Sequence, residues 1–244
     1  MSARVTFAVV RRVLQQLRRD PRTIALILAV PCVLELLLQQ LFGRNSPVFQ
    51  SIGAPLLGLF PFIAMFLVTS ITMLRERTTG TLERLMTMPL HKIDILAGYG
   101  IAFALVAVVQ AALVSVLAFG LLGLNVAGPK WLVVVLAVAN AVLGSTLGLF
   151  VSAFAQTEFQ AVQFMPAVVF PQILLCGLLV PRDEMATWLR AISYVLPLTY
   201  AYDALARTAA DLLDARFALD VAVVCGCIVL AVALGAATLR RRTA

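Results

Sequence analysis

Six apolar runs, each long enough to cross a lipid bilayer, constrain this chain more than any other feature. They cover about residues 22–41, 55–74, 94–122, 131–153, 161–180 and 217–239. About 20 helical residues, each rising about 1.5 Å, span a hydrocarbon core of about 30 Å. Because lipid offers no water to backbone polar groups, such runs must be helical. The sequence therefore predicts an all-α, polytopic membrane protein with six transmembrane helices, forming one domain over residues 1–244.

The distribution of charge favours a membrane partner over nucleic acid. The chain is 62% hydrophobic and only 13% charged, against about 25% charged residues in soluble proteins. A net charge of +7 is compatible with nucleic-acid binding, but the basic residues stand at the ends of the apolar runs. Most of the 19 Lys and Arg residues fall on one side of the predicted membrane. By the positive-inside rule that side is cytoplasmic, so we expect both termini in the cytoplasm and no nucleic-acid partner.

The segment before the first run reads as a basic amphipathic helix over residues 4–19. Arginines recur every seven residues, at Arg4, Arg11 and Arg18. The opposing face is apolar and carries Val10, Val13, Leu14 and Leu17. This pattern is typical of a helix that lies in the headgroup plane. Asp20 is expected to cap the next helix, with Pro21 at its first position.

A charged stretch, residues 75–89, separates the second and third runs. Each charge would cost roughly 2.5–3.5 kcal/mol at the centre of a membrane helix, so the stretch must lie in water. Apolar residues recur within it at helical spacing, at Leu82, Leu85 and Met86. They predict a short amphipathic helix that Gly80 can open and Pro89 ends. A helix this short is unstable alone, so a partner must cover its apolar stripe.

Two further segments carry structural predictions. Pro166 and Pro171 predict a kink or break in the fifth run. Residues 181–216 are too long for a plain turn, and their apolar residues predict a short helix at the outer surface, at Met185, Trp188, Leu189 and Ile192. The next residues, 195–202, contain proline and tyrosine and suit an interfacial or re-entrant turn. Either an aromatic belt or an outer lid over an exit path accounts for them.

Glu35 is an unusual carboxyl within the first run. A charge at this depth should face protein or a water-filled cavity. Two interpretations stay open: a polar group on a substrate path, or a buried hydrogen-bonded or protonated carboxyl that joins helices. Gln39 and Asn140 are the other residues we place on a possible substrate path.

Catalytic and metal-binding patterns are missing from the sequence. No G-x-x-x-x-G-K-[ST] loop, Ser/His/Asp set or H-E-x-x-H motif occurs, so we expect no ATP hydrolysis by this chain and no catalytic residues. The four cysteines lie inside apolar runs and His91 stands alone, so we predict no metal site, no disulfide and no cofactor in this chain.

One motif carries a family resemblance. The segment from Leu74 to Leu85, followed by Met88-Pro89-Leu90, resembles the E-x-x-x-G-T-[LI]-E-x-L-x-x-x-P pattern of type-2 ATP-binding cassette (ABC) exporter permeases. That family includes antibiotic-resistance efflux and polysaccharide export subunits. Three further stretches agree in order and spacing: Asp20-Pro21, Gln156–Ala161 and Leu196–Tyr200. The resemblance covers nearly the whole chain.

The resemblance implies a function and two kinds of partner. The chain would be a permease subunit in a bacterial inner (plasma) membrane, paired with a second copy or a sister permease. A separate cytoplasmic ABC ATPase, which holds ATP and Mg, would dock on a coupling helix. The implied coupling residues are Glu76, Gly80, Thr81, Leu82, Glu83, Leu85, Met86 and Pro89, and the implied outer turn contains Pro197, Thr199 and Tyr200. Glu76 and Glu83 would pair with local arginines or with the partner.

The apolar character of the spans bears on the substrate. Few polar residues are available to coordinate ions or sugars, which favours a drug, antibiotic or lipid over a polysaccharide or lipid-linked glycan. A secondary transporter or channel would require carboxylates on several spans or an inverted repeat, and a non-transporting scaffold would not need the amphipathic helix between two spans. We therefore expect an exporter of hydrophobic or amphipathic molecules.

Overall fold

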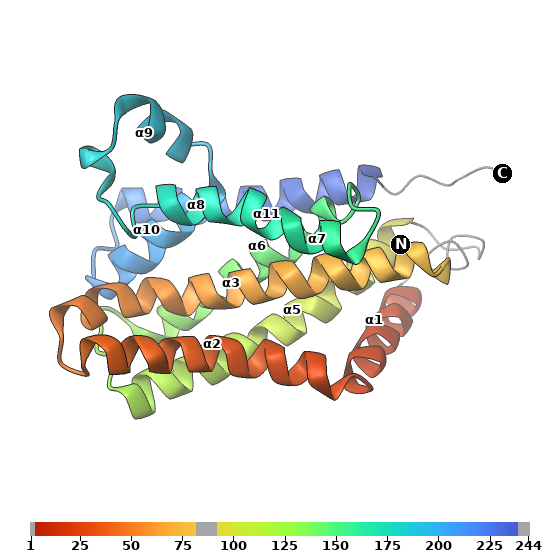
Figure 1. Cartoon of the computed structure of the whole chain (residues 1–244), viewed down its shortest axis with the longest axis horizontal. Coiled ribbons are helices and arrows are strands. Elements are labelled where there is room, and N and C mark those ends of the chain that lie inside the picture. Colours follow the sequence, from red (N-terminus) through yellow and green to blue (C-terminus); the bar gives the residue numbers. More distant parts are fainter. Residues whose placement is uncertain (1–2, 82–91, 239–244) are drawn as a thin grey trace.

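The computed structural model describes residues 3–81 and 92–238, and this part of the chain forms helices and no strands. The elements are α1 (Ala3–Arg18), α2 (Pro21–Phe42), α3 (Pro47–Thr78), α5 (Lys92–Val116), η1 (Leu117–Leu122), α6 (Lys130–Val151), α7 (Glu158–Phe164), η2 (Met165–Val169), α8 (Phe170–Leu175), η3 (Arg182–Glu184), α9 (Thr187–Ser193), α10 (Pro197–Ala209) and α11 (Ala215–Thr238). The long helices form a bundle, and α1 lies across one end of it (Figure 1). The prediction of an all-α fold is confirmed for these residues.

Five helices of the described part are long and apolar enough to cross a membrane. They are Pro21–Phe42, Pro47–Thr78, Ala97–Leu122, Lys130–Val151 and Ala215–Thr238. The remaining predicted span, 161–180, is a rod of three short segments, α7, η2 and α8, that ends at Leu175. A π-helical segment surrounds Pro166, where proline removes a backbone donor. The predicted irregularity is therefore present, and a count of six crossings stays a prediction.

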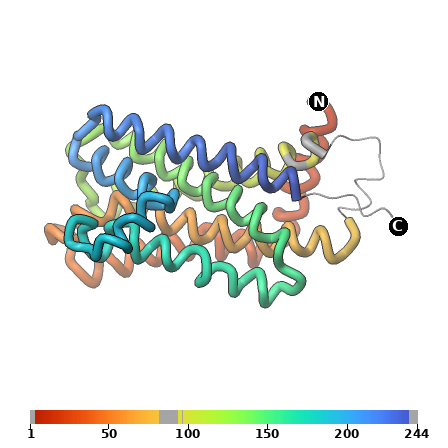
Figure 2. The backbone as a smooth tube through the Cα atoms, turned by 90° about the horizontal axis from the view of Figure 1, so that it is seen from above, coloured from red at the N-terminus to blue at the C-terminus, as the bar shows by residue number. Residues whose placement is uncertain are grey.

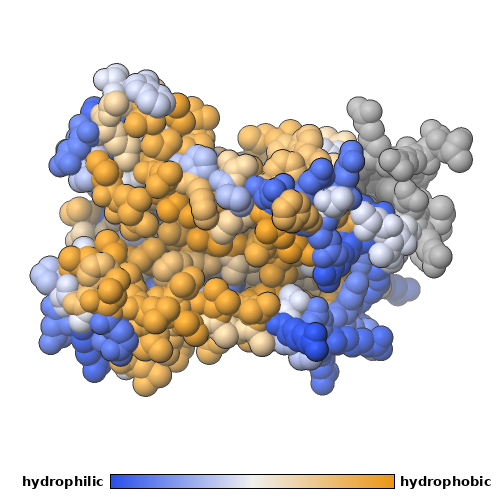
Figure 3. Space-filling model, in the orientation of Figure 1, coloured by the Kyte–Doolittle hydropathy of each residue, from blue (hydrophilic) through white to orange (hydrophobic). Residues whose placement is uncertain are grey.

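The surface of the bundle has an apolar belt between two polar ends (Figure 3). Apolar side chains on α2 and α11 are widely exposed in this belt; Leu37 is 57% exposed and Val229 is 68% exposed. Exposed apolar surface on this scale requires lipid or another apolar partner. The belt therefore agrees with an integral membrane protein.

One end of the bundle gathers segments that are far apart in the sequence. The helix α1, the end of α3, the start of α5 and the end of α11 all lie there, while α9 and η3 lie at the opposite end (Figures 1 and 2). The sequence places the same segments on a single side of the membrane. Which side faces the cytoplasm stays a prediction.

The centre of the bundle is a close contact between α3 and α6. A Cβ atom at Gly144 would lie 2.3 Å from the carbonyl oxygen of Phe62, and one at Gly148 would lie 2.5 Å from that of Phe66. Both phenylalanine side chains are fully buried. Small residues spaced four apart let two membrane helices approach this closely. This glycine seam, Gly144 and Gly148 against α3, fixes the spacing of the two central helices.

Several helix boundaries differ from those predicted. Asp20 does cap α2, because its Oδ1 accepts the Thr23 N–H at 3.1 Å. The helix α3, however, starts well before the predicted span and continues through the charged residues to Thr78. Gly80 has φ +70° just after α3, which is typical of the residue that ends a helix. Thr81, the next residue, is again helical, so a helix that opens at Gly80 stays a prediction.

We expect Gly144→Ala to destabilise the protein by about 1–3 kcal/mol, because the added methyl group must push apart two helix backbones. Gly226→Ala in α11 is the matched control, since a Cβ there meets no atom within 4 Å. The melting temperatures of both variants are measured on the detergent-solubilised full chain, with size-exclusion chromatography to monitor the loss of folded protein on heating. Equal melting temperatures for the two variants would show that the glycine seam is not under steric constraint.

Candidate functional site

Three helices are joined by charged and polar side chains at the α1 end of the bundle. The Nη2 of Arg12 donates to both carboxylate oxygens of Glu76, at 3.0 and 2.7 Å. The Nη1 of the same arginine donates to the Tyr99 hydroxyl at 3.4 Å. These residues belong to α1, α3 and α5 respectively. We call the set Arg12, Glu76 and Tyr99 the three-helix clamp.

Apolar packing brings the clamp together. The side chains of Val9, Val10 and Val13 are buried, and a Cβ at Gly98 of α5 would lie 2.6 Å from the Val9 side chain. This contact holds α1 against α5. The side chain of Glu76 is only 2% exposed and that of Arg12 is 31% exposed. A carboxylate this buried requires a cation, and the α1–α5 contact places one beside it.

A second ion pair joins α3 to α7. The Nε of Arg75 donates to Glu158 Oε1 at 2.7 Å, and its Nη2 donates to Oε2 at 3.0 Å. This pairing lowers the pKa of Glu158 below its usual value. Both side chains are more than half exposed, so the pair contributes little to stability. It nevertheless orients the start of α7, where Thr157 accepts the Gln160 N–H as an N-cap.

The structure places only some of the predicted coupling residues. Glu76 is buried in α3, and Gly80 and Thr81 follow that helix. The others lie outside the described residues: Leu82, Glu83, Leu85, Met86 and Pro89. The partner of Glu76 is not a local arginine but Arg12, 64 positions away. Arg12 and Arg19 both stand one place outside the seven-residue register of the other arginines, so the sequence carries no signal that separates the buried-pair arginine from the exposed one.

A large groove opens beside α2 and α3 near the clamp. Its volume is about 630 Å³, within the range of about 300–1,000 Å³ typical of small-molecule sites. The walls are apolar and include Val30, Leu34, Phe60 and Leu67. Polar side chains gather toward α1, at Gln16, Asp20, Thr23 and Arg75. We call this the lateral groove.

The residues predicted on a substrate path do not line the lateral groove. Glu35 is fully buried near Gly53 and Leu124, and neither carboxylate oxygen has a hydrogen-bond partner in the described part of the chain. Gln39 accepts a bond from Gln40 at 3.1 Å near the end of α2. The three residues therefore have different surroundings.

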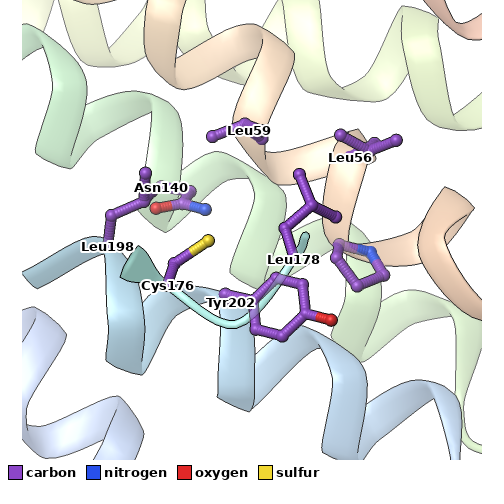
Figure 4. A pocket seen from close by; sticks show the side chains of 8 residues that line it. Leu56, Leu59, Asn140, Cys176, Leu178, Leu198 and Tyr202 are labelled. Carbon is purple, nitrogen blue, oxygen red and sulfur yellow. The ribbon is translucent and has the colours of Figure 1, made fainter. Parts of the chain in front are cut away.

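Asn140 lines a small cavity between α3, α6 and α10 (Figure 4). The cavity has a volume of about 10 Å³, and its lining includes Cys176 and Tyr202. That volume suits one water molecule and is too small for a drug or lipid. The Oδ1 of Asn140 has no protein hydrogen-bond partner among the described residues. A bound water would satisfy it.

The predicted outer turn is the beginning of a helix. Pro197 occupies the first position of α10, where its missing N–H costs nothing. Thr199 is buried and its hydroxyl donates to the Ser193 carbonyl at 2.8 Å. The hydroxyl of Tyr200 donates to the Tyr194 carbonyl at 2.7 Å. These bonds fix α10 to the end of α9. The helix α9 itself, Thr187–Ser193, confirms the short helix predicted in the region of residues 185–192.

The start of α10 is also held by α8. The Leu198 N–H donates to Gln172 Oε1 at 3.4 Å, and Gln172 itself donates to the Val168 carbonyl at 3.0 Å. An ion pair between Arg182 and Asp203 adds a second connection across this end. The elements η3, α9 and α10 therefore form one connected cap on the bundle.

Comparison with known proteins identifies similar transport proteins. ABC transporter G family member 20 of Dictyostelium discoideum is 27% identical over 165 residues, 67% of this chain and 23% of that protein. The probable multidrug ABC transporter permease YbhR of Escherichia coli (strain K12) is 27% identical over 169 residues, 69% and 46% of the two chains. The inner membrane transport permease YhhJ of the same organism is 30% identical over 135 residues, 54% and 36%. The chain spans less than half the length of each of these relatives.

A family match covers most of the chain. Residues 4–208 fit the sequence profile described as ABC-2 type transporter. The matched region runs from the basic helix α1 through the clamp residues and the bundle to α10. Together with the apolar belt and the five membrane-length helices, this match shows that the chain is an integral membrane protein and belongs to the ABC-2 type transporter family.

Proposed function

We propose that this chain is the membrane-spanning permease subunit of an ATP-driven ABC exporter in a bacterial inner (plasma) membrane. Its substrate is a hydrophobic or amphipathic molecule, such as a drug, antibiotic or lipid, that moves out of the cell. A separate cytoplasmic ABC ATPase supplies the energy. The observation that carries the proposal is the three-helix clamp, which ties α1 to the two helices that flank residues 82–91.

The clamp gives this end of the bundle the stiffness that energy coupling requires. Residues 80–89 are the proposed docking segment for the ATPase, and they join α3 to α5. Separating Arg12 from Glu76 would leave a buried carboxylate without its cation, which is costly. A displacement of the docking segment would therefore move α1, α3 and α5 together as a rigid body.

The lateral groove supports an amphipathic substrate. Its apolar walls match a hydrocarbon or aromatic body, and its polar end offers both an acidic and a basic side chain, Asp20 and Arg75. A glycan would need many hydrogen-bonding groups that these walls lack. The relative named as a probable multidrug ABC transporter permease, YbhR, supports the same substrate class. A drug or lipid is therefore favoured over a polysaccharide or lipid-linked glycan.

The exposed apolar helices support assembly with a second permease. Most of the surface of α2 and α11 is uncovered in the single chain. A second copy, or a sister permease, would cover part of it, and lipid would cover the rest. Both termini lie in the cytoplasm in this arrangement, on the side where the ATPase docks.

The docking segment can be tested by Leu85→Asp. The change removes an apolar contact worth about 1.5–3 kcal/mol, so we expect at least a tenfold weaker association with the ATPase while the chain still inserts into the membrane. The measurement is ATP-dependent uptake of a fluorescent amphipathic dye into inverted vesicles that contain a co-expressed ABC ATPase.

Leu212→Asp is the matched control, because Leu212 is an exposed leucine in the connection between α10 and α11 at the opposite end. It should leave uptake unchanged. Normal uptake and normal ATPase stimulation with Leu85→Asp would contradict the docking role. Uptake driven by a proton gradient alone would identify a secondary transporter instead.

The clamp can be tested by Arg12→Gln, which leaves Glu76 buried without its cation. We expect a loss of about 1–3 kcal/mol of stability and a melting temperature lower by roughly 2–4 °C per kcal/mol. Arg11→Gln is the control, since Arg11 is exposed. The double variant Arg12→Gln/Glu76→Gln should recover part of the loss, because no buried charge remains. Additive losses in the double variant would show that the two side chains do not act as a pair.

A further inference from the structure

We propose that the corner between α1 and α2 binds an anionic phospholipid, with one acyl chain in an apolar groove and the phosphate beside Arg18. This groove, which we call the corner groove, lies between α1, α2 and α5 and has a volume of about 300 Å³. The proposal depends on membrane insertion and not on the transported substrate or on the ATPase.

The lining of the corner groove is suited to a hydrocarbon chain. Its walls come from Leu14 and Leu17 of α1, Ile24 and Leu28 of α2, and Leu105 and Val109 of α5. Arg18 is the polar side chain among the described residues that line it. It stands at the last position of α1, a helix with the character of an interfacial helix. An acyl chain would therefore contact the apolar walls, and the phosphate of the same lipid would lie beside the guanidinium of Arg18.

The charge around the corner favours an anion. Five exposed arginines at this end make no ion pair among the described residues: Arg4, Arg11, Arg18, Arg19 and Arg22. Among the described residues, Glu76 and Glu158 already have their own arginines. The Asp20 carboxylate accepts bonds from the backbone and the side chain of Thr23. A phosphate is the complement that this surplus of positive charge lacks.

The lateral groove provides a contrast on the other face of α2. Its polar end holds Asp20 and an Arg75 that is paired with Glu158. The acidic and basic side chains at this polar end offset each other. The lateral groove therefore has no preference for an anionic headgroup. The selectivity for an anionic lipid therefore belongs to the corner groove and to Arg18 in particular.

The position of the corner groove gives the lipid an effect on the clamp. Leu14 and Leu17 follow Arg12 on the same helix, so a lipid seated against them holds α1 between the membrane surface and α5. A higher proportion of anionic lipid in the surrounding membrane would thus strengthen the contact of α1 with α5.

Lipid quenching of a single tryptophan tests the proposal. The full chain carries Leu105→Trp as reporter, with Trp131→Phe and Trp188→Phe to remove the native fluorescence, in nanodiscs of phosphatidylcholine. Dibrominated phosphatidylglycerol or dibrominated phosphatidylcholine is titrated in. We expect about fivefold stronger apparent binding of the anionic lipid, the contribution of about one arginine at a membrane surface. Glycerol 3-phosphate, a headgroup without chains, should not displace it.

Two variants locate the effect. Arg18→Gln should abolish the preference, while Arg216→Gln, an exposed arginine at the start of α11, should keep it. Equal quenching by the two lipids, or a preference that survives Arg18→Gln, would overturn the proposal. Native mass spectrometry of the otherwise unaltered chain with and without Arg18→Gln gives a second measurement that does not need the tryptophan reporter. There, equal retention of both lipids by the unaltered chain would overturn it as well.

Discussion

A buried carboxylate governs the organisation of one end of this molecule. Glu76 belongs to the long helix α3 at a depth where water does not reach it. Leaving such a charge unpaired is unfavourable, so a cation must be delivered from another element. The chain supplies it from α1, and the apolar contact of α1 with α5 holds that cation in place. The buried charge and the apolar contact together hold the basic amphipathic helix against α3 and α5.

The remainder of the bundle divides into a rigid centre and an open periphery. The glycine seam brings α3 and α6 so close that their backbones touch, and the side chains around it are buried. By contrast, α2 and α11 are largely uncovered and carry apolar side chains outward. Both grooves border α2, one of these two uncovered helices. Tight packing and ligand-sized space thus occupy separate regions of the fold.

Features set by local sequence were predictable, and features set by distant contacts were not. The membrane-length helices, the cap at Asp20 and the amphipathic α1 follow from hydropathy, spacing and capping, which are local. The extent of α3 was missed because Glu76 read as a solvent-exposed charge, whereas it is buried against Arg12 of α1. The start of α10 was read as a turn because Pro197 suits both a turn and a first helical position. The grooves depend on how helices meet, which no single segment encodes.

The π-helical segment η2 joins two helices that are each bonded to a different part of the molecule. Below it, α7 is bonded to α3 through Glu158, and above it α8 holds the first turn of α10 through Gln172. A wide turn around a proline has fewer regular backbone bonds than the helix on either side. The rod of α7, η2 and α8 is therefore anchored at both ends, and its helical geometry changes at Pro166, between the two anchors.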